Sequence, residues 1–391
     1  MNPLLRAEQA VLGSVLLDPG QLAHLDWLAP DHFYRPVHQA LFAALRKLRN
    51  DGHPALAAEQ SAPPLSWVTD AVDEASRHVR GLTAAYPHTL ISACPRSEHA
   101  PVYGRMVLEG AIHRSITEHA IRLHQAARAD ALRGEAEGAL HSADVLTGVL
   151  NDLARRWGTE PRPVAPIPPP STTTVVPPPV RADQVAEDER FLLAVLVERP
   201  GAMGEVVGWL RPGDFADPSH GQLYRCLGAL HHRGEPIDRI TLLWEAQQRG
   251  LLADGTLSDD QLTAICDGVG AGSAEWLGEQ VIRSSVTRTA AASARAVRSL
   301  AENETLAPGR LINHALHALG PLDDVRTRWQ TANGRPAPSP TAPALAPTGT
   351  PPAQVRAALS RSTPRAAPPP SARPSSAPTP AAAPPPSRGH N

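Results

Sequence analysis

Residues 27–54, WLAPDHFYRPVHQALFAALRKLRNDGHP, decide the fold, because the chain repeats them at residues 209–236 as WLRPGDFADPSHGQLYRCLGALHHRGEP. Aromatic, proline and histidine side chains recur between the two stretches at one fixed offset of 182 residues. These matched positions are Phe33, Pro36 and His38 in the first stretch and Phe215, Pro218 and His220 in the second. Agreement of so many positions at one offset indicates that the chain contains two diverged copies of one unit.

The second half of each stretch has the spacing of an amphipathic helix. Apolar side chains recur three and four residues apart on one face, at Leu41, Leu45 and Leu48 and again at Leu223, Leu227 and Leu230. A glycine follows each run, and glycine is the usual residue just beyond a helix end. The sequence therefore predicts one such helix in each copy, ended by Gly52 or Gly234.

Each copy closes with two long helical segments. The first covers about residues 103–130 in copy one and 274–303 in copy two, and the second ends at an Arg-Trp pair in both copies. Two consecutive helices joined by a short turn form a hairpin. We therefore predict an all-α fold in which two small helical bundles each end in a helical hairpin.

Proline-rich stretches separate and follow the two copies. Residues 161–180 hold nine prolines and a threonine run, which is typical of an extended polyproline spacer. Residues 55–100 fit the repeat poorly, and we interpret them as a diverged insertion. The predicted units are copy one at 1–160, a linker at 161–182, copy two at 183–330 and a disordered tail, rich in Pro, Ala, Ser and Arg, at 331–391.

Net charge, cysteine spacing and the distribution of apolar residues exclude several classes of protein. The formal net charge of -2 is too small for non-specific nucleic-acid binding by the whole molecule. The three cysteines are widely spaced and include no CxxC pair, which argues against a disulfide framework and a zinc ribbon. Neither an export signal nor a long apolar run is present. The sequence therefore predicts a cytoplasmic protein without a membrane partner.

Three stretches carry a resemblance to a known family: AEQAVLGSVLLDPG at 7–20, the repeated stretch at 27–54, and GEPIDRITLLWEAQQRGLL at 234–252. They resemble the N-terminal domain of DnaB-type replicative helicases, and also look like the helicase-binding domain of DnaG-type primases. The resemblance implies a small helical bundle with a hairpin through which subunits pair, forming the collar that docks primase.

The sequence departs from that family where the motor domain is expected. A nucleotide-binding P-loop needs the pattern GxxxxGK[ST], in which a lysine reaches the phosphates. Lys47 is the only lysine in the chain, and it lies between Arg46 and Leu48 without that pattern. A second collar-like copy and the tail take the motor's place. We therefore predict a protein that is not an enzyme and has no cofactor.

Two further sets of residues need an interpretation. His38 and His220 have no metal-ligand or base partner at a fixed spacing, so we interpret both as structural residues that cap or brace the following helix. The hairpin ends, with Arg156, Trp157, Arg328 and Trp329, fit two interpretations. They form a protein interface, in which Trp and Arg are over-represented, or the tryptophans close the hairpin core.

The sequence favours a non-catalytic scaffold of the replication machinery, whose partner is a replicative helicase or a primase and whose hairpins allow self-association. One alternative is a collar subunit for a separately encoded helicase motor. Another is a diverged regulatory or DNA-binding protein that uses the domain only to dimerise. The basic tail offers weak contact with nucleic acid through its arginines.

Overall fold

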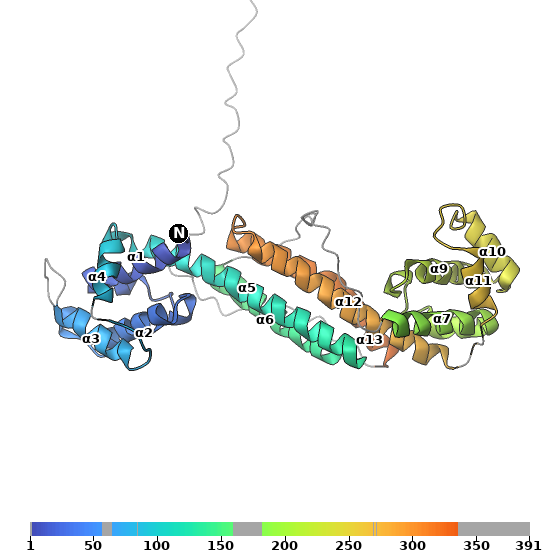
Figure 1. Ribbon diagram of the computed structural model, residues 1–391, viewed down its shortest axis with the longest axis horizontal. Coiled ribbons are helices and arrows are strands. Elements are labelled where there is room, and N and C mark those ends of the chain that lie inside the picture. Colours follow the sequence, from blue (N-terminus) through green and yellow to red (C-terminus); the bar gives the residue numbers. More distant parts are fainter. Residues whose placement is uncertain are drawn as a thin grey trace, which may run out of the picture.

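The structure of the chain is a computed structural model that describes residues 2–56, 65–83, 85–158, 182–268, 270 and 272–334 (Figure 1). These residues form α-helices and short 3-10 helices, with no strand among them, so the predicted all-α fold is confirmed. The predicted linker lies outside the described residues except for Ala182, and the predicted tail does so from residue 335 onward.

The first copy consists of a head, formed by α1 to α4, and a hairpin, formed by α5 and α6. Its helices are α1 (Pro3–Leu17), α2 (Pro36–Asn50), α3 (Leu65–Ser76), α4 (Tyr86–Ala93), α5 (Ala100–Arg133) and α6 (Glu137–Trp157). Its 3-10 helices are η1 (Pro19–His24), η2 (Pro30–His32), η3 (Pro54–Leu56) and η4 (Ser97–His99).

The second copy has the same plan, with a head formed by α7 to α11 and a hairpin formed by α12 and α13. Its helices are α7 (Ala182–Glu198), α8 (Met203–Val206), α9 (Pro218–Arg233), α10 (Arg239–Gln248), α11 (Asp259–Cys266), α12 (Ala274–Glu302) and α13 (Pro308–Ala332). Its 3-10 helices are η5 (Pro200–Ala202) and η6 (Pro212–Asp214).

The repeated stretch folds into equivalent helices, α2 and α9. Pro36 and Pro218 occupy the first helical position of each, where the missing backbone N–H costs nothing. Just beyond each helix a glycine has a left-handed backbone, with φ of 73° at Gly52 and 67° at Gly234. The predicted glycine ends are confirmed. Glycine is suited to these two positions because a left-handed backbone is strained for other residues.

Within the part that the structure describes, residues 55–100 contain no additional α-helix relative to the second copy, although the 3-10 helix η4 has no counterpart there. α3 and α4 are the counterparts of α10 and α11, and both copies then enter their hairpins, at Ala100 and Ala274. The offset falls from 182 to 174 residues, so the first copy is eight residues longer here. The region is therefore a diverged part of the repeat. The repeat is hard to recognise from the sequence in this region, because α3 packs through Trp67 whereas α10 packs through smaller residues such as Leu242.

The buried apolar side chains form two separate cores. The first head encloses its own core, which includes Phe33, Phe42 and Trp67. The second head shares one continuous core with both hairpins, which includes Leu123, Trp209 and Ile312 in different elements. Burying each such side chain contributes roughly 1.5–3 kcal/mol. We therefore expect the second head and the hairpins to unfold together.

The two hairpins pack against each other as a bundle between the heads, with α5 antiparallel to α12 (Figure 1). His113, early in α5, has Nδ1 at 2.8 Å from the carbonyl oxygen of Ala301, late in α12. Arg283, early in α12, donates to the carbonyl of Gly134 beyond the end of α5 at 3.3 Å. α6 and α13 also touch, because Arg326 donates to the carbonyl of Leu140 at 3.1 Å.

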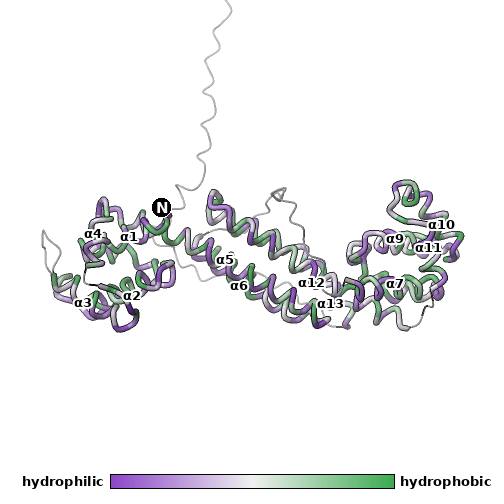
Figure 2. The backbone as a smooth tube through the Cα atoms, in the orientation of Figure 1, coloured by the Kyte–Doolittle hydropathy of each residue, from purple (hydrophilic) through white to green (hydrophobic). Residues whose placement is uncertain are grey.

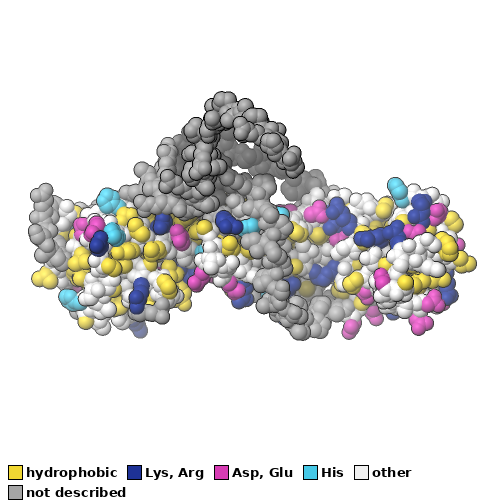
Figure 3. Space-filling model, turned by 90° about the horizontal axis from the view of Figure 1, so that it is seen from above, with side chains coloured by type: hydrophobic (Ala, Val, Ile, Leu, Met, Phe, Trp, Pro, Cys, Tyr) yellow, Lys and Arg dark blue, Asp and Glu magenta, His cyan; other side chains and the backbone are white. Residues whose placement is uncertain are grey.

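The hydropathy of the residues alternates along these helices. Figure 2 shows hydrophobic and hydrophilic residues following one another along each helix of the bundle, as an amphipathic pattern requires. Figure 3 shows basic, acidic and hydrophobic side chains mixed over the visible face of both heads. Among the described helices, none combines the length and the apolarity that crossing a bilayer requires.

Candidate protein-interaction site

In the first head, His38 joins three elements. It is fully buried on α2, and its Nδ1 lies 2.7 Å from Oε2 of Glu8 on α1. Its Nε2 lies 2.7 Å from the hydroxyl of Tyr86 on α4. The Glu8 carboxylate also accepts a hydrogen bond from the backbone N–H of Tyr34 at 2.5 Å. His38 thus contacts other elements through both ring nitrogens, a geometry that braces α2 rather than caps it.

The second head repeats part of this arrangement. Nδ1 of His220 lies 2.9 Å from Oε2 of Glu189 on α7, and Glu189 is fully buried. The His220 side chain is 12% exposed, and no equivalent of the Tyr86 contact is present among the described residues. The motif aromatics are also paired, since the Phe215 and Tyr224 rings are 5.1 Å apart. The glutamates were missed as partners, although Glu8 and Glu189 precede the histidines by nearly equal intervals.

The tryptophans at the hairpin ends are buried. Trp157 and Trp329 are each 4% exposed and belong to the core that the hairpins share with the second head. This is the position that the core-closing interpretation gives them. Of the two arginines beside them, Arg156 has a side chain that is 67% exposed, whereas that of Arg328 is 12% exposed. A partner that binds at the hairpin ends can therefore reach Arg156 but not the indole rings.

Arg328 is largely buried, and Asp214, in η6, binds it. The Asp214 carboxylate also accepts hydrogen bonds from Oγ of Ser285 at 2.9 Å and from the backbone N–H of Arg211 at 2.7 Å. Asp214 is 1% exposed, and Arg288 donates to its backbone carbonyl. One carboxylate therefore ties the second head to both helices of its hairpin.

The first copy keeps the arginine but lacks this carboxylate. His32 stands at the equivalent of Asp214, and its Nδ1 accepts the backbone N–H of Ala29 at 3.0 Å. The imidazole thereby replaces one contact of Asp214 and leaves the others without a counterpart. Arg156, the equivalent of Arg328, pairs instead with Asp152, its Nε lying 2.7 Å from Oδ2.

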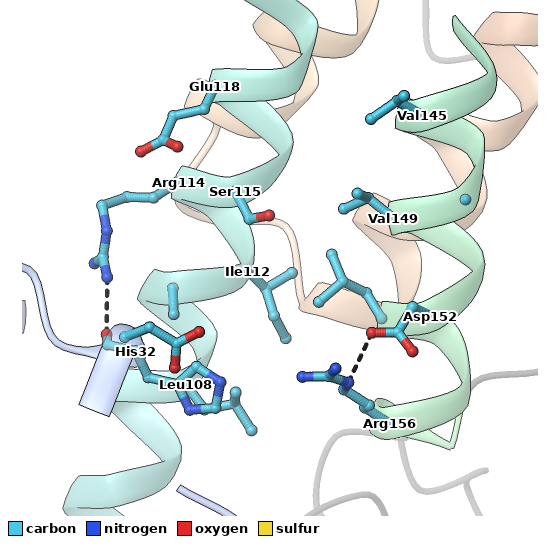
Figure 4. Close-up of a pocket in the computed structure, with 14 residues that line it drawn as sticks. His32, Leu108, Ile112, Arg114, Ser115, Glu118, Val145, Val149, Asp152 and Arg156 are labelled. Carbon is cyan, nitrogen blue, oxygen red and sulfur yellow. Dashed lines mark hydrogen bonds and ion pairs between the residues drawn. The ribbon is translucent and has the colours of Figure 1, made fainter. Parts of the chain in front are cut away.

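A groove of about 580 Å³ opens at this place, between α5 and α6 and beside η2 (Figure 4). Apolar side chains from both helices line it, and charged side chains from three elements stand around them. The apolar residues include Leu108, Ile112, Val145, Val149 and Leu153, and the charged ones are Asp31, Arg114, Glu118, Asp152 and Arg156. An apolar floor with a charged rim is the composition of a protein-binding surface.

The environment of the groove keeps His32 uncharged near neutral pH. Burial lowers the pKa of His32 below its ordinary value of 6.5, and the neighbouring Arg156 and Arg114 guanidiniums lower it further against the opposing effect of Asp31. Arg114 itself donates to the backbone carbonyl of His32 at 2.8 Å (Figure 4). The positive charge of the groove is therefore carried by its arginines.

The side chains of the described segments do not assemble a metal site, since no group of three or more His, Cys, Asp or Glu is placed to hold an ion there. The sequence-predicted residues thus fall into two kinds of place. The Phe and His side chains of the motif lie inside the heads, whereas Pro36 and Pro218 are exposed at the helix starts, and the Arg-Trp pairs lie at the hairpin ends. The groove beside Arg156 is the accessible feature among them.

Comparison with known proteins agrees with this architecture. The chain matches the family described as DnaB-like helicase N terminal domain over residues 1–109 and 181–271. It is 36% identical over 122 residues to the replicative DNA helicase DnaB of Mycobacterium leprae (strain TN), which covers 31% of this chain and 19% of that helicase. No solved structure matches the chain.

Two other helicases show the same partial coverage. The replicative DNA helicase DnaB of Geobacillus stearothermophilus is 32% identical over 124 residues, covering 31% of this chain and 25% of the helicase. That of Treponema pallidum (strain Nichols) is 33% identical over 115 residues, covering 29% of this chain and 24% of the helicase. The chain thus spans a quarter or less of these relatives, and the family match concerns their N terminal domain.

That domain is matched twice, once in each copy, and the two matched segments make up just over half of the chain. The relation to replicative helicases therefore rests on both heads, each of which places its glutamate and histidine in contact. The chain belongs to the DnaB-like helicase N terminal domain family.

Proposed function

We propose that the chain is a non-catalytic scaffold of DNA replication, in which the paired hairpins hold two collar-type heads apart and leave the groove beside Arg156 open to a replicative helicase or a primase. The observation that carries this proposal is the antiparallel packing of α5 on α12 within one chain. Equivalent helices that pair in this way reproduce the arrangement of a two-fold symmetric dimer. One chain thus supplies a pair of hairpins that would otherwise come from two identical subunits.

The seam between the hairpins is built for close packing. Ala120 on α5 and Ala290 and Ala294 on α12 are at most 1% exposed. Small side chains allow two helix backbones to approach each other closely, and a larger side chain at such a place forces the helices apart. Because each hairpin already covers the other, the face that would join a second chain is occupied.

Two of the three cysteines are poorly suited to act as nucleophiles, which supports a non-catalytic role. Burial raises the pKa of the Cys226 thiol to about 11 and also raises the pKa of Cys266. A thiol with a raised pKa stays protonated near neutral pH and is a poor nucleophile. His38 and His220 each bind a glutamate of the same head, an arrangement that stabilises the fold.

We expect the purified chain to be a monomer of 41.5 kDa over a wide concentration range, as measured by size-exclusion chromatography with light scattering. The variant Ala294→Arg should have a larger hydrodynamic radius and associate with rising concentration, because it places a guanidinium in the buried seam. Ala296→Arg, on the exposed side of α12, is the matched control and should behave as the wild type. A wild-type dimer would contradict intramolecular pairing.

The groove beside Arg156 provides the variant that tests partner binding. We expect the immobilised full chain to retain the replicative helicase or the primase of its host at micromolar concentration. Val145→Arg, in the groove, should weaken retention by at least about tenfold, because it places a long charged side chain over the apolar floor. Val145 is 42% exposed, so the substitution should leave the fold intact.

Val207→Arg is the control for that experiment, since Val207 is 44% exposed on the second head and outside the groove. Equal retention of both variants would remove the groove from the interface and leave the scaffold proposal standing. Failure of the folded wild-type chain to retain either protein at about 10 µM would argue against the scaffold itself.

A further inference from the structure

The charge of the bundle is unevenly distributed along its two central helices. Residues 119–129 of α5 contain two arginines and two histidines without an acidic residue. Residues 280–301 of α12 contain four arginines, again without an acidic residue. The whole chain has a formal charge of -2, so these two segments are basic against a nearly neutral background.

Antiparallel packing brings the two basic segments together. His124 on α5 faces the backbone of Ala291 on α12, and the guanidiniums of Arg295, Arg128 and Arg298 are close enough to lower its pKa, although burial lowers it more. Arg128 lies one helical turn beyond His124, and Arg295 lies one turn beyond Ala291. Arginines from both hairpins therefore lie on one side of the seam.

All three arginines are exposed, but only two of them are unpaired among the described residues. Arg128 and Arg295 are exposed and have no ion-pair partner among the described residues. Arg298 has a side chain that is 54% exposed and pairs with Glu302, its Nε lying 2.7 Å from Oε1. The other arginines of the α12 segment are already engaged, since Arg283 binds Gly134 and Arg288 binds Asp214.

We propose that Arg128, Arg295 and Arg298 form a basic stripe across the hairpin seam that binds the phosphate backbone of a nucleic acid. Guanidiniums bind phosphate oxygens through charge-assisted hydrogen bonds, and a row of arginines along a helix is the electrostatic signature of such a surface. A helical rise of 1.5 Å per residue spreads the stripe over roughly 15 Å, which is long enough for two or three consecutive phosphates.

The stripe exists only in the paired state, because one arginine comes from the first hairpin and two come from the second. Binding to it is independent of sequence, since phosphates carry no base information. Affinity should fall as salt rises, with a slope set by the small number of phosphates neutralised.

Fluorescence anisotropy with a labelled DNA oligonucleotide, single-stranded and then duplex, tests this proposal on the full chain. We expect binding at ~50 mM salt that weakens toward ~200 mM salt. The double variant Arg128→Glu with Arg295→Glu should bind at least about tenfold more weakly at the lower salt and should reduce the salt slope by about 2. Its helical content, measured by circular dichroism, should equal that of the wild type.

Arg80→Glu with Arg225→Glu is the matched control, because both residues are exposed, lie on different heads and change the net charge by the same amount. The control should bind as the wild type does. An equal loss in both double variants would assign the effect to net charge and overturn the proposal. Undiminished binding by the stripe variant would place the binding site elsewhere in the chain and overturn the proposal, and absence of wild-type binding would likewise overturn it.

Discussion

Asp214→Ala is expected to lower the free energy of unfolding of the second head and the hairpin bundle by about 3–5 kcal/mol, because it removes the buried carboxylate that binds Arg328 and leaves this largely buried arginine with Asp324, 3.7 Å away, as its counter-charge. The substitution also removes the acceptor for Oγ of Ser285 and for the backbone N–H of Arg211. A buried donor without a partner loses its hydration and gains nothing in return.

Urea denaturation followed by circular dichroism measures this effect. Because the first head has its own core, its transition should stay unchanged while the transition of the shared core shifts. Asp324→Ala is the matched control, since Asp324 also pairs with Arg328, at 3.7 Å, and with Arg211, at 2.8 Å, but is 55% exposed. Surface ion pairs contribute up to about 1 kcal/mol, so the control should shift the transition little. Equal shifts for the two variants would contradict a buried role for Asp214.

His38→Ala is expected to destabilise the first head by about 3–5 kcal/mol, because Glu8 stays buried after losing its imidazole partner. The hydroxyl of Tyr86 loses its partner as well, and a cavity opens on α2. This loss concerns the first head alone. It should appear in the unfolding transition that Asp214→Ala leaves unchanged.

His220→Ala provides the comparison for His38→Ala. The two histidines occupy equivalent positions, but His220 is 12% exposed and has one ring contact, to Glu189 at 2.9 Å. Water can replace part of that contact, so we expect a loss of about 1–2 kcal/mol. Thermal and urea unfolding of both variants checks the ranking. A larger loss for His220→Ala would show that burial and the Tyr86 contact do not set the cost.

The contrast between Asp214 and His32 explains how two copies of one fold come to differ. Both side chains accept a backbone N–H within their 3-10 turn, from Arg211 and from Ala29 respectively. The carboxylate also binds the hydroxyl of Ser285 through Oδ1 and the guanidinium of Arg328 through Oδ2, whereas the imidazole nitrogen of His32 makes the backbone contact alone. The substitution therefore preserves the local turn in the first copy, and the groove beside Arg156 lies where the second copy has its buried ion pair.

The repeated stretch by itself indicated the helices α2 and α9 and the presence of two copies. Residues such as Leu41, Leu45 and Leu48 follow the helical period, and Gly52 supplies the left-handed turn, because these are local properties of the backbone. The hairpins at 100–157 and 274–332 were predicted for the same reason. The family was indicated by the same motifs, since they form the contacts inside each head.

Only the tertiary structure decided which helices pack against one another. The contact of His113 with Ala301 joins residues 188 positions apart, and no sequence period records such a distance. The burial of Trp157, the ion pair of Asp214 with Arg328 and the position of Arg128 and Arg295 near His124 likewise depend on which helix faces which. Local spacing determines which face of a helix is apolar, but the partner of that face is chosen by packing over the whole chain.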